Sequence, residues 1–105
     1  MFLSYGSQKI DDDDIIAVAN VLRNDLLTTG PTVEKFEAAL ASKLDVRHVI
    51  TSSSGTAALH LAAMALGLGP NDTVIVPSIT FLATANAARY VDAEVVFADV
   101  DPDSG

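Results

Sequence analysis

The sequence contains no cysteine and no tryptophan, and only six of its 105 residues are lysine or arginine. The absence of cysteine excludes disulfides and thiol catalysis. Fourteen carboxylates give a net charge of −8, so a basic nucleic-acid-binding surface is not expected. An acidic chain can still bind a phosphate if the donors are backbone N–H groups at a helix start instead of lysine or arginine side chains.

Long apolar runs are also missing, although half of the residues are hydrophobic. Glycine, proline and charged residues interrupt every apolar segment well before the roughly 20 residues that a membrane span requires. The first nine residues have neither the basic start nor the long apolar core of a secretory signal. We therefore expect one small soluble domain at most, located in the cytoplasm, with no membrane or nucleic-acid partner.

Helical and extended patterns alternate along the chain. Apolar positions 15, 18, 19 and 22 share one helical face, and the aspartates at 11–14 suit the start of that helix better than a metal site. A second helix is expected from Pro31 or Thr32 to Leu44. The remaining pattern predicts strands at 47–52, 73–77 and 94–99 and helices at 55–66 and 80–91. This alternation predicts an α/β fold with a mainly parallel sheet and flanking helices.

The polar turn at 53–56 is the most informative segment, because it precedes an alanine-rich helix. Backbone N–H groups in a first helical turn lack intrahelical acceptors and face the positive end of the helix dipole. Gly55 lets an anion approach the backbone, and Ser54 and Thr56 add hydroxyl donors. An ordinary helix cap explains the same residues. At the next strand end, Phe81 is placed either to stack on a flat heterocycle or to pack in the core.

Four ordered motifs span nearly the whole chain. They are a loop at 27–31 followed by Phe36 and Glu37, the turn and helix start at 53–61, the segments 77–81 and 83–87, and the strand end at 96–101. Together they closely resemble the amino-terminal part of the DegT/DnrJ/EryC1/StrS family of pyridoxal-phosphate-dependent sugar aminotransferases. The resemblance implies the amino-terminal portion of an aspartate aminotransferase-like (fold type I) large domain. It divides the chain into a helical segment with a substrate loop (1–46) and the start of the cofactor-binding α/β domain (47–105).

The resemblance also implies roles for individual residues. Ser54, Gly55 and Thr56 correspond to the turn that holds the phosphate of the cofactor, pyridoxal 5′-phosphate, and Phe81 to the aromatic side chain against its pyridine ring. The residues that correspond to substrate-contacting positions are Tyr5, Asp25, Leu26, Leu27, Thr28 and Gly55. No metal ion is expected.

The catalytic lysine of the family, which forms a Schiff base with the cofactor, has no counterpart in this sequence. Lys9, Lys35 and Lys43 fall near the terminus or on the second expected helix, and His48 and His60 lie where packing or surface placement is expected. We therefore expect a fragment of a longer enzyme that does not catalyse transamination by itself. A short non-catalytic α/β binding or interaction module is the alternative.

For the parent enzyme, the resemblance implies a homodimer that aminates a 4-keto-6-deoxy nucleotide sugar, with glutamate as the expected amino donor. Such a reaction belongs to cell-surface polysaccharide or amino-sugar biosynthesis. The short connection at 102–105 is similar to that of members that make the 4-amino sugar precursor of pseudaminic acid. Family members that dehydrate or isomerise their substrates leave the reaction type open.

Overall fold

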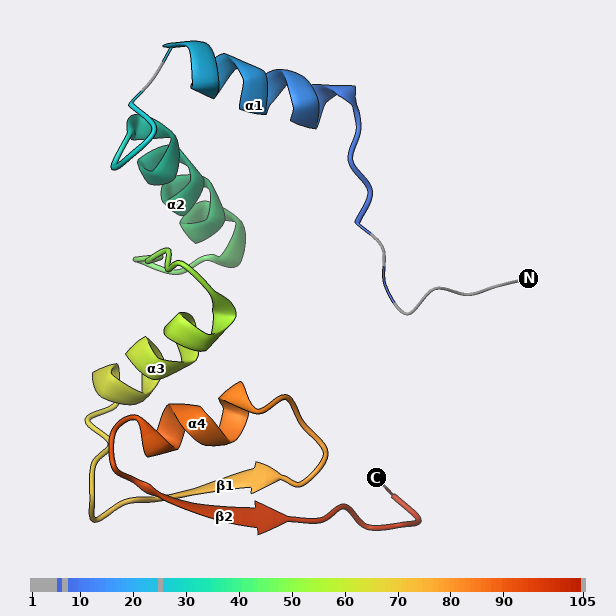
Figure 1. Cartoon of the computed structure of the whole chain (residues 1–105), viewed down its shortest axis with the longest axis vertical. Coiled ribbons are helices and arrows are strands. Elements are labelled where there is room, and N and C mark those ends of the chain that lie inside the picture. Colours follow the sequence, from blue (N-terminus) through green and yellow to red (C-terminus); the bar gives the residue numbers. More distant parts are fainter. Residues whose placement is uncertain (1–5, 7, 25, 105) are drawn as a thin grey trace. The chain divides into compact units, whose positions relative to one another are not determined.

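The computed structural model describes residues 6, 8–24 and 26–104, which form four helices and two strands (Figure 1). The chain divides into two compact units between Ile50 and Thr51. The elements of the first unit are α1 (Asp12–Asn24) and α2 (Pro31–Leu44), and those of the second are α3 (Gly55–Ala65), β1 (Thr73–Pro77), α4 (Ala83–Arg89) and β2 (Glu94–Ala98). Within the described ranges, no helix is both long and apolar enough to cross a membrane.

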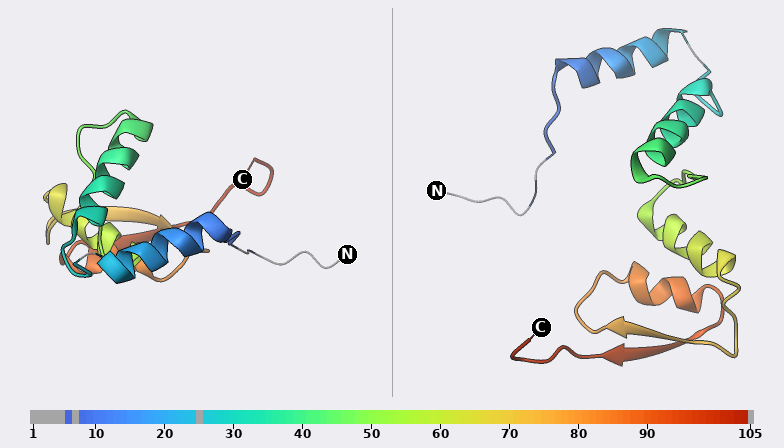
Figure 2. Two further views of the ribbon diagram at one scale, coloured as in Figure 1. Left: turned by 90° about the horizontal axis from the view of Figure 1, so that it is seen from above. Right: turned by 180° about the vertical axis from the view of Figure 1, so that it is seen from behind.

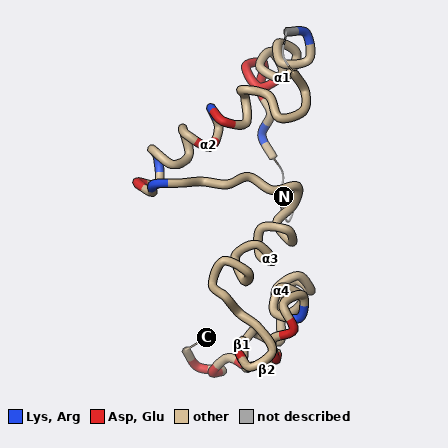
Figure 3. Tube along the Cα trace, turned by 90° about the vertical axis from the view of Figure 1, so that its left-hand side faces the viewer, with Lys and Arg blue, Asp and Glu red and all other residues tan. Residues whose placement is uncertain are grey.

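The first helix begins at the aspartate run, as expected. Asp12, Asp13 and Asp14 form the first turn of α1, where acidic side chains interact favourably with the helix dipole (Figure 3). The Asp11 N–H donates to the Asp14 carboxylate at 3.1 Å, and the Asp14 N–H donates back to Asp11 at 3.3 Å. This reciprocal cap satisfies two backbone donors that the helix itself leaves without acceptors.

Helix α1 is amphipathic, but its apolar face is not buried within its own unit. Ile15, Val18 and Leu22 each remain more than half exposed. The second helix begins at Pro31, as predicted, and ends at Leu44, and its C-cap Asp45 adopts the left-handed conformation with φ 53°. The Val46 N–H then returns to the Ala41 carbonyl at 3.0 Å, closing the helix end.

The second unit is a β-α-β arrangement preceded by α3. Strands β1 and β2 pair in parallel, from Thr73 opposite Glu94 to Pro77 opposite Ala98. Helix α4 connects them and lies along one face of the sheet, as two further views in Figure 2 also show. The buried apolar residues lie around this helix and are small: Ala63, Val76, Ala83, Ala87, Ala88 and Ala93. The expected α/β fold with a parallel sheet is confirmed.

One predicted strand and the bounds of one predicted helix are wrong. The β-branched run at 47–52 is not a strand, since the described sheet contains β1 and β2 paired only with each other. A strand is defined by its hydrogen-bonded neighbour, and β-branched composition cannot replace that ladder. Helix α4 begins at Ala83, not at residue 80, and ends at Arg89. Residues 78–82 instead form a bend that leads from β1 into the helix.

Candidate functional site

The start of α3 presents unpaired backbone donors. Ser54 is the N-cap: its backbone is extended, and its Oγ accepts a hydrogen bond from the Ala57 N–H at 3.2 Å. The Ala58 N–H donates to the Ser54 carbonyl at 3.0 Å. In the described part of the chain, the N–H groups of Gly55 and Thr56 have no hydrogen-bond partner. These two donors are therefore available to an external acceptor.

The described segment around this helix start carries no lysine or arginine. Between His48 and Ala88 the sequence holds a single charged residue, Asp72, and Figure 3 shows α3 free of lysine, arginine, aspartate and glutamate. Any attraction of this turn for an anion must come from the backbone N–H groups and the dipole of an 11-residue helix. The Ser54 hydroxyl hydrogen and the Thr56 hydroxyl add neutral donors.

The segment that follows β1 brings an aromatic ring to the same unit. The Ser78 N–H donates to the Ala98 carbonyl at 3.2 Å and prolongs the ladder beyond β1. After this bond the chain bends, and Phe81 follows with 78% of its surface exposed. The core placement that was one interpretation of Phe81 is therefore wrong for this unit. An exposed aromatic ring offers a flat apolar face to a ligand.

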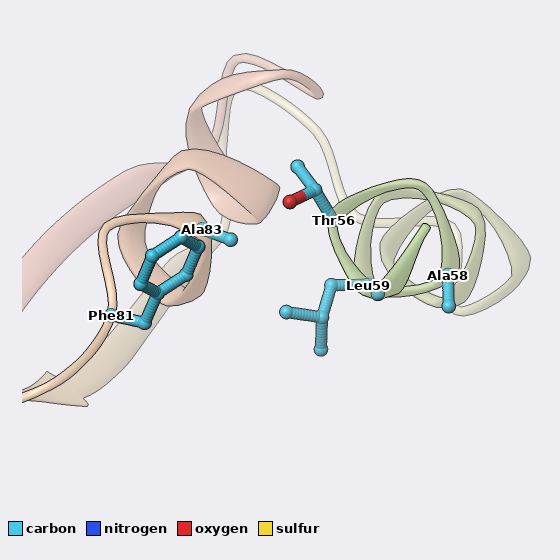
Figure 4. A pocket seen from close by; sticks show the side chains of 6 residues that line it. Thr56, Ala58, Leu59, Phe81 and Ala83 are labelled. Atoms are coloured by element: carbon cyan, nitrogen blue, oxygen red, sulfur yellow. The ribbon is translucent and has the colours of Figure 1, made fainter. Parts of the chain in front are cut away.

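These two segments meet at an open cavity of about 520 Å³. The residues that line it are Gly55, Thr56, Ala58, Leu59, Phe81 and Ala83. Figure 4 shows Phe81 on one side and Leu59 on the other, with the Thr56 hydroxyl directed into the space between the two segments. The cavity thus combines polar donors at one helix start with an apolar region beside them. No titratable side chain is among its lining residues, so what these residues can do is bind and orient.

The cavity brings together three of the residues predicted from the sequence. Gly55, Thr56 and Phe81 line it, and Ser54 caps the helix that supplies the first two. The turn at 53–56 and the segment after β1 therefore line one cavity, even though the run before that turn is not a strand. That these residues bind a cofactor stays a prediction.

Of the expected substrate residues, Gly55 lines this cavity, and the described residues of the loop at 26–28 are not among its lining residues. Leu26, Leu27 and Thr28 belong to the first unit and are exposed. In the same loop, the Thr29 hydroxyl donates to the Thr28 carbonyl at 2.7 Å. Tyr5 and Asp25 fall outside the described residues. Contact of this loop with a sugar substrate stays a prediction.

Ala58, Leu59 and Ala83 line the cavity but were not predicted from the sequence. Leu59 lies one helical turn after Gly55 and Thr56, so helical periodicity places it on the same face. Ala83 is the first residue of α4 and is 5% exposed. The 3.6-residue period contained the signal for Leu59, whereas the position of Ala83 depends on where α4 begins.

His60 packs against Tyr90, which is one of the two placements expected for it. Its ring lies 5.2 Å from that of Tyr90, centroid to centroid, with an angle of 55° between the planes. The contact joins α3 to the end of α4, which are the two elements that form the cavity. His60 thereby supports the arrangement of the site and does not line it.

Comparison with known proteins identifies the family to which this chain is similar. The model of the DegT/DnrJ/EryC1/StrS aminotransferase family matches residues 8–105. A curated relative, the UDP-4-amino-4-deoxy-L-arabinose–oxoglutarate aminotransferase of Shewanella sediminis (strain HAW-EB3), is 42% identical over 103 residues, which are 98% of this chain and 26% of the relative.

Solved structures agree with this match in both fold and cofactor. Spr1654 of Streptococcus pneumoniae, assigned as a sugar aminotransferase and solved in PLP, PMP and apo forms, is 31% identical, with a TM-score of 0.86 over 97% of this chain and 26% of its own. A family member from Brucella abortus is 46% identical, with a TM-score of 0.71 over 86% of this chain and 24% of its own. These neighbours support the fold type I assignment and pyridoxal phosphate as the cofactor.

The chain spans about a quarter of the length of the relatives that it matches. The family model nevertheless matches almost all of it, including the turn at 53–56, the cavity residues and the sheet. This chain belongs to the DegT/DnrJ/EryC1/StrS aminotransferase family.

Proposed function

We propose that the cavity holds pyridoxal 5′-phosphate, with the phosphate at the start of α3 and the pyridine ring against Phe81. The observation that carries this proposal is the convergence of Gly55, Thr56 and Phe81 on one cavity from two separate segments. A phosphate bound there accepts hydrogen bonds from the two backbone N–H groups that lack partners in the described structure. Ser54 stabilises the helix start through its bond to the Ala57 N–H and can donate its hydroxyl hydrogen.

The geometry at Gly55 fits a phosphate group. A Cβ atom added to Gly55 would meet no atom within 4 Å, so the space in front of this backbone is open. An anion can therefore approach the N–H groups without displacing a side chain. Phe81 and Leu59 then provide apolar contact for the planar, less polar part of the same molecule.

The cofactor, when bound, acts as an electron sink and carries an amino group from a donor to a ketone. The residues of this chain bind and orient it: α3 holds the phosphate and Phe81 restricts the tilt of the ring. The lysine that bonds the cofactor and the carboxylate that pairs with its ring nitrogen are not among these 105 residues. We propose that they belong to a longer polypeptide of which this chain is the amino-terminal part.

For the whole protein we propose amination of the 4-keto group of a nucleotide sugar, with glutamate as donor. The keto oxygen is exchanged for an amino group, and glutamate is converted to 2-oxoglutarate, so the overall reaction balances. The Shewanella relative, whose name specifies a UDP-linked 4-amino sugar and oxoglutarate, supports this reaction class. A 4-keto-6-deoxy hexose of the pseudaminic-acid-precursor type is the finer form of the proposal. We further propose that the whole protein is a homodimer located in the cytoplasm.

The test uses the complete gene product that contains these residues. The protein is incubated with pyridoxal phosphate, ¹⁵N-labelled glutamate and either a UDP-4-keto-pentose or a UDP-4-keto-6-deoxy-hexose. Transfer of ¹⁵N to the sugar, detected by mass spectrometry, is the expected result, and the preferred sugar decides between the two substrates. Cofactor binding without transfer to either sugar would favour the non-catalytic binding module.

A variant of Thr56 separates the cofactor site from the substrate question. Thr56→Val removes the hydroxyl that faces the cavity while it preserves the shape of the side chain. We expect about tenfold weaker binding of pyridoxal phosphate, the effect of losing one hydrogen bond to a charged group. Binding of pyridoxal, which has no phosphate, should be unchanged. An equal loss for both ligands would place the phosphate away from α3.

A further inference from the structure

Phe81 is held by its backbone and not by its surroundings. The side chain is 78% exposed, and its neighbours Ile79 and Leu82 are 92% and 69% exposed. Apolar packing within this unit therefore restricts the segment little. The orientation of the ring relative to α3 must depend on the hydrogen bonds of residues 78–84.

A pair of threonine hydroxyls bridges this segment. The Oγ1 atoms of Thr80 and Thr84 lie 2.8 Å apart, and either can donate. Inside the same loop, the Thr84 N–H donates to the Phe81 carbonyl at 3.0 Å. One bond thus starts immediately before Phe81 and the other starts at Phe81 itself, and both end at Thr84 in the first turn of α4. Together they connect the Phe81 backbone to α4, whose Ala83, Ala87 and Ala88 are buried.

The far end of this connection is anchored by packing. Ala83, Ala87 and Ala88 of α4 are the buried residues on either side of Thr84, and Thr84 itself is half-buried. The near end, Thr80, is exposed and has no such anchor. A hydrogen bond to the half-buried Thr84 therefore restricts the exposed Thr80, with the free energy of one ordinary hydrogen bond.

We propose that Thr80 and Thr84 are positioning residues that hold Phe81 at the wall of the cavity. Neither lines the cavity, and their effect on a ligand passes through the Phe81 ring. This inference rests on the proposed function only where it concerns the cofactor. The restriction of the loop itself is a property of the protein alone.

The first measurement needs no cofactor. Hydrogen–deuterium exchange of the Thr84 amide reports how often the turn opens, because this N–H is bonded to the Phe81 carbonyl. In the complete gene product, Thr80→Val should raise this exchange rate about threefold to tenfold, the loss expected for one hydrogen bond. Thr84→Val should give the same increase at the amide of residue 84, once each rate is divided by the intrinsic rate for that residue type, and Thr80→Ser, which keeps the hydroxyl, should exchange as slowly as the wild type. If either valine variant fails to fold, the other still decides the question.

The second measurement is the dissociation constant of pyridoxal 5′-phosphate. Thr80→Val should weaken binding by no more than Phe81→Leu does, and should have no further effect in a Phe81→Leu background. The matched control is Thr73→Val, at the other end of β1, which removes a hydroxyl that lies 3.4 Å from the Glu94 carboxylate. This control should change neither the Thr84 exchange rate nor the affinity.

The outcomes separate this inference from the proposed function. Unchanged exchange in both valine variants overturns the positioning role, whatever binds. Faster exchange with unchanged affinity, or an equal loss of affinity in the Phe81→Leu background, overturns the link to the cofactor. If the wild-type protein does not bind pyridoxal phosphate, the proposed function fails, while the exchange rates still decide whether the hydroxyl pair restrains Phe81.

Discussion

Replacement of Gly55 by alanine should affect folding and cofactor binding in opposite directions. Gly55 is the first residue of α3, and its φ lies outside the left-handed region that disfavours side chains. The new Cβ would meet no atom within 4 Å. Since alanine has less freedom in the unfolded chain, we expect the free energy of unfolding to rise by about 0.4–1 kcal/mol.

The same methyl group should impair binding. It would occupy the space through which a phosphate reaches the N–H groups of Gly55 and Thr56. Losing one of these bonds to a charged acceptor costs about 1.5–3 kcal/mol, which corresponds to a dissociation constant roughly 10- to 150-fold higher. The variant should therefore be as stable as the wild type, or more so, and bind pyridoxal phosphate much more weakly.

Gly67→Ala is the matched control, because its expected pattern is the reverse. Gly67 follows the C-cap of α3 with φ +72°, a conformation that costs an L-residue about 1–2 kcal/mol. Urea unfolding should show a loss of stability near this value, and titration with pyridoxal phosphate should show unchanged affinity. Both measurements are made on the complete gene product.

Two results would refute the reasoning about Gly55. Unchanged affinity in Gly55→Ala would mean that the phosphate does not approach this backbone. A loss of stability would mean that the space in front of Gly55 is filled in the native protein by another part of the polypeptide, so that the site would have to be sought elsewhere.

Three further predictions concern the cap, the loop and the final turn. Ser54→Ala should destabilise the protein by about 1 kcal/mol through loss of the helix cap, as measured by urea unfolding. Ser54→Asp should keep the cap but weaken pyridoxal phosphate binding through charge repulsion, as measured by cofactor titration. Gly30→Ala should raise the KM for the nucleotide sugar without changing cofactor affinity, because its Cβ would collide with the Leu26 carbonyl oxygen and displace the expected substrate loop. Hydrogen bonds from the N–H groups of Asp103 and Ser104 lower the pKa of Asp101 below 3.8. The turn at 101–104 should therefore be stabilised above that pH and lose this contribution as pH falls through the lower folded pKa, which NMR of the Ser104 amide would detect and Asp101→Asn would abolish.

Local signals in the sequence were sufficient for much of the fold. The start of α1 at the aspartate run and the start of α2 at Pro31 depend on capping and backbone preferences within a few residues. The two parallel strands follow from β-branched runs separated by a helix. The family motifs carried the cofactor prediction, because they specify residue types at ordered positions.

The segment at 47–52 shows where such signals end. Its β-branched residues favour a strand, as those of β1 do, yet of these two segments only β1 has a neighbour to pair with among the described elements. Phe81 shows the same limit for burial, since its residue type favours the core but its side chain is exposed.

By itself, the sequence determined the family, the helix start that follows the polar turn at 53–56, and the lack of basic side chains in the segment around it. Only the tertiary structure decided that Phe81 lines the same cavity as Gly55 and Thr56, that Leu59 lies opposite it, and that Thr80 and Thr84 bridge the bend between them. The physical reason is range: caps and helix starts depend on neighbours within one turn, whereas a cavity and a strand exist only where segments distant in sequence meet.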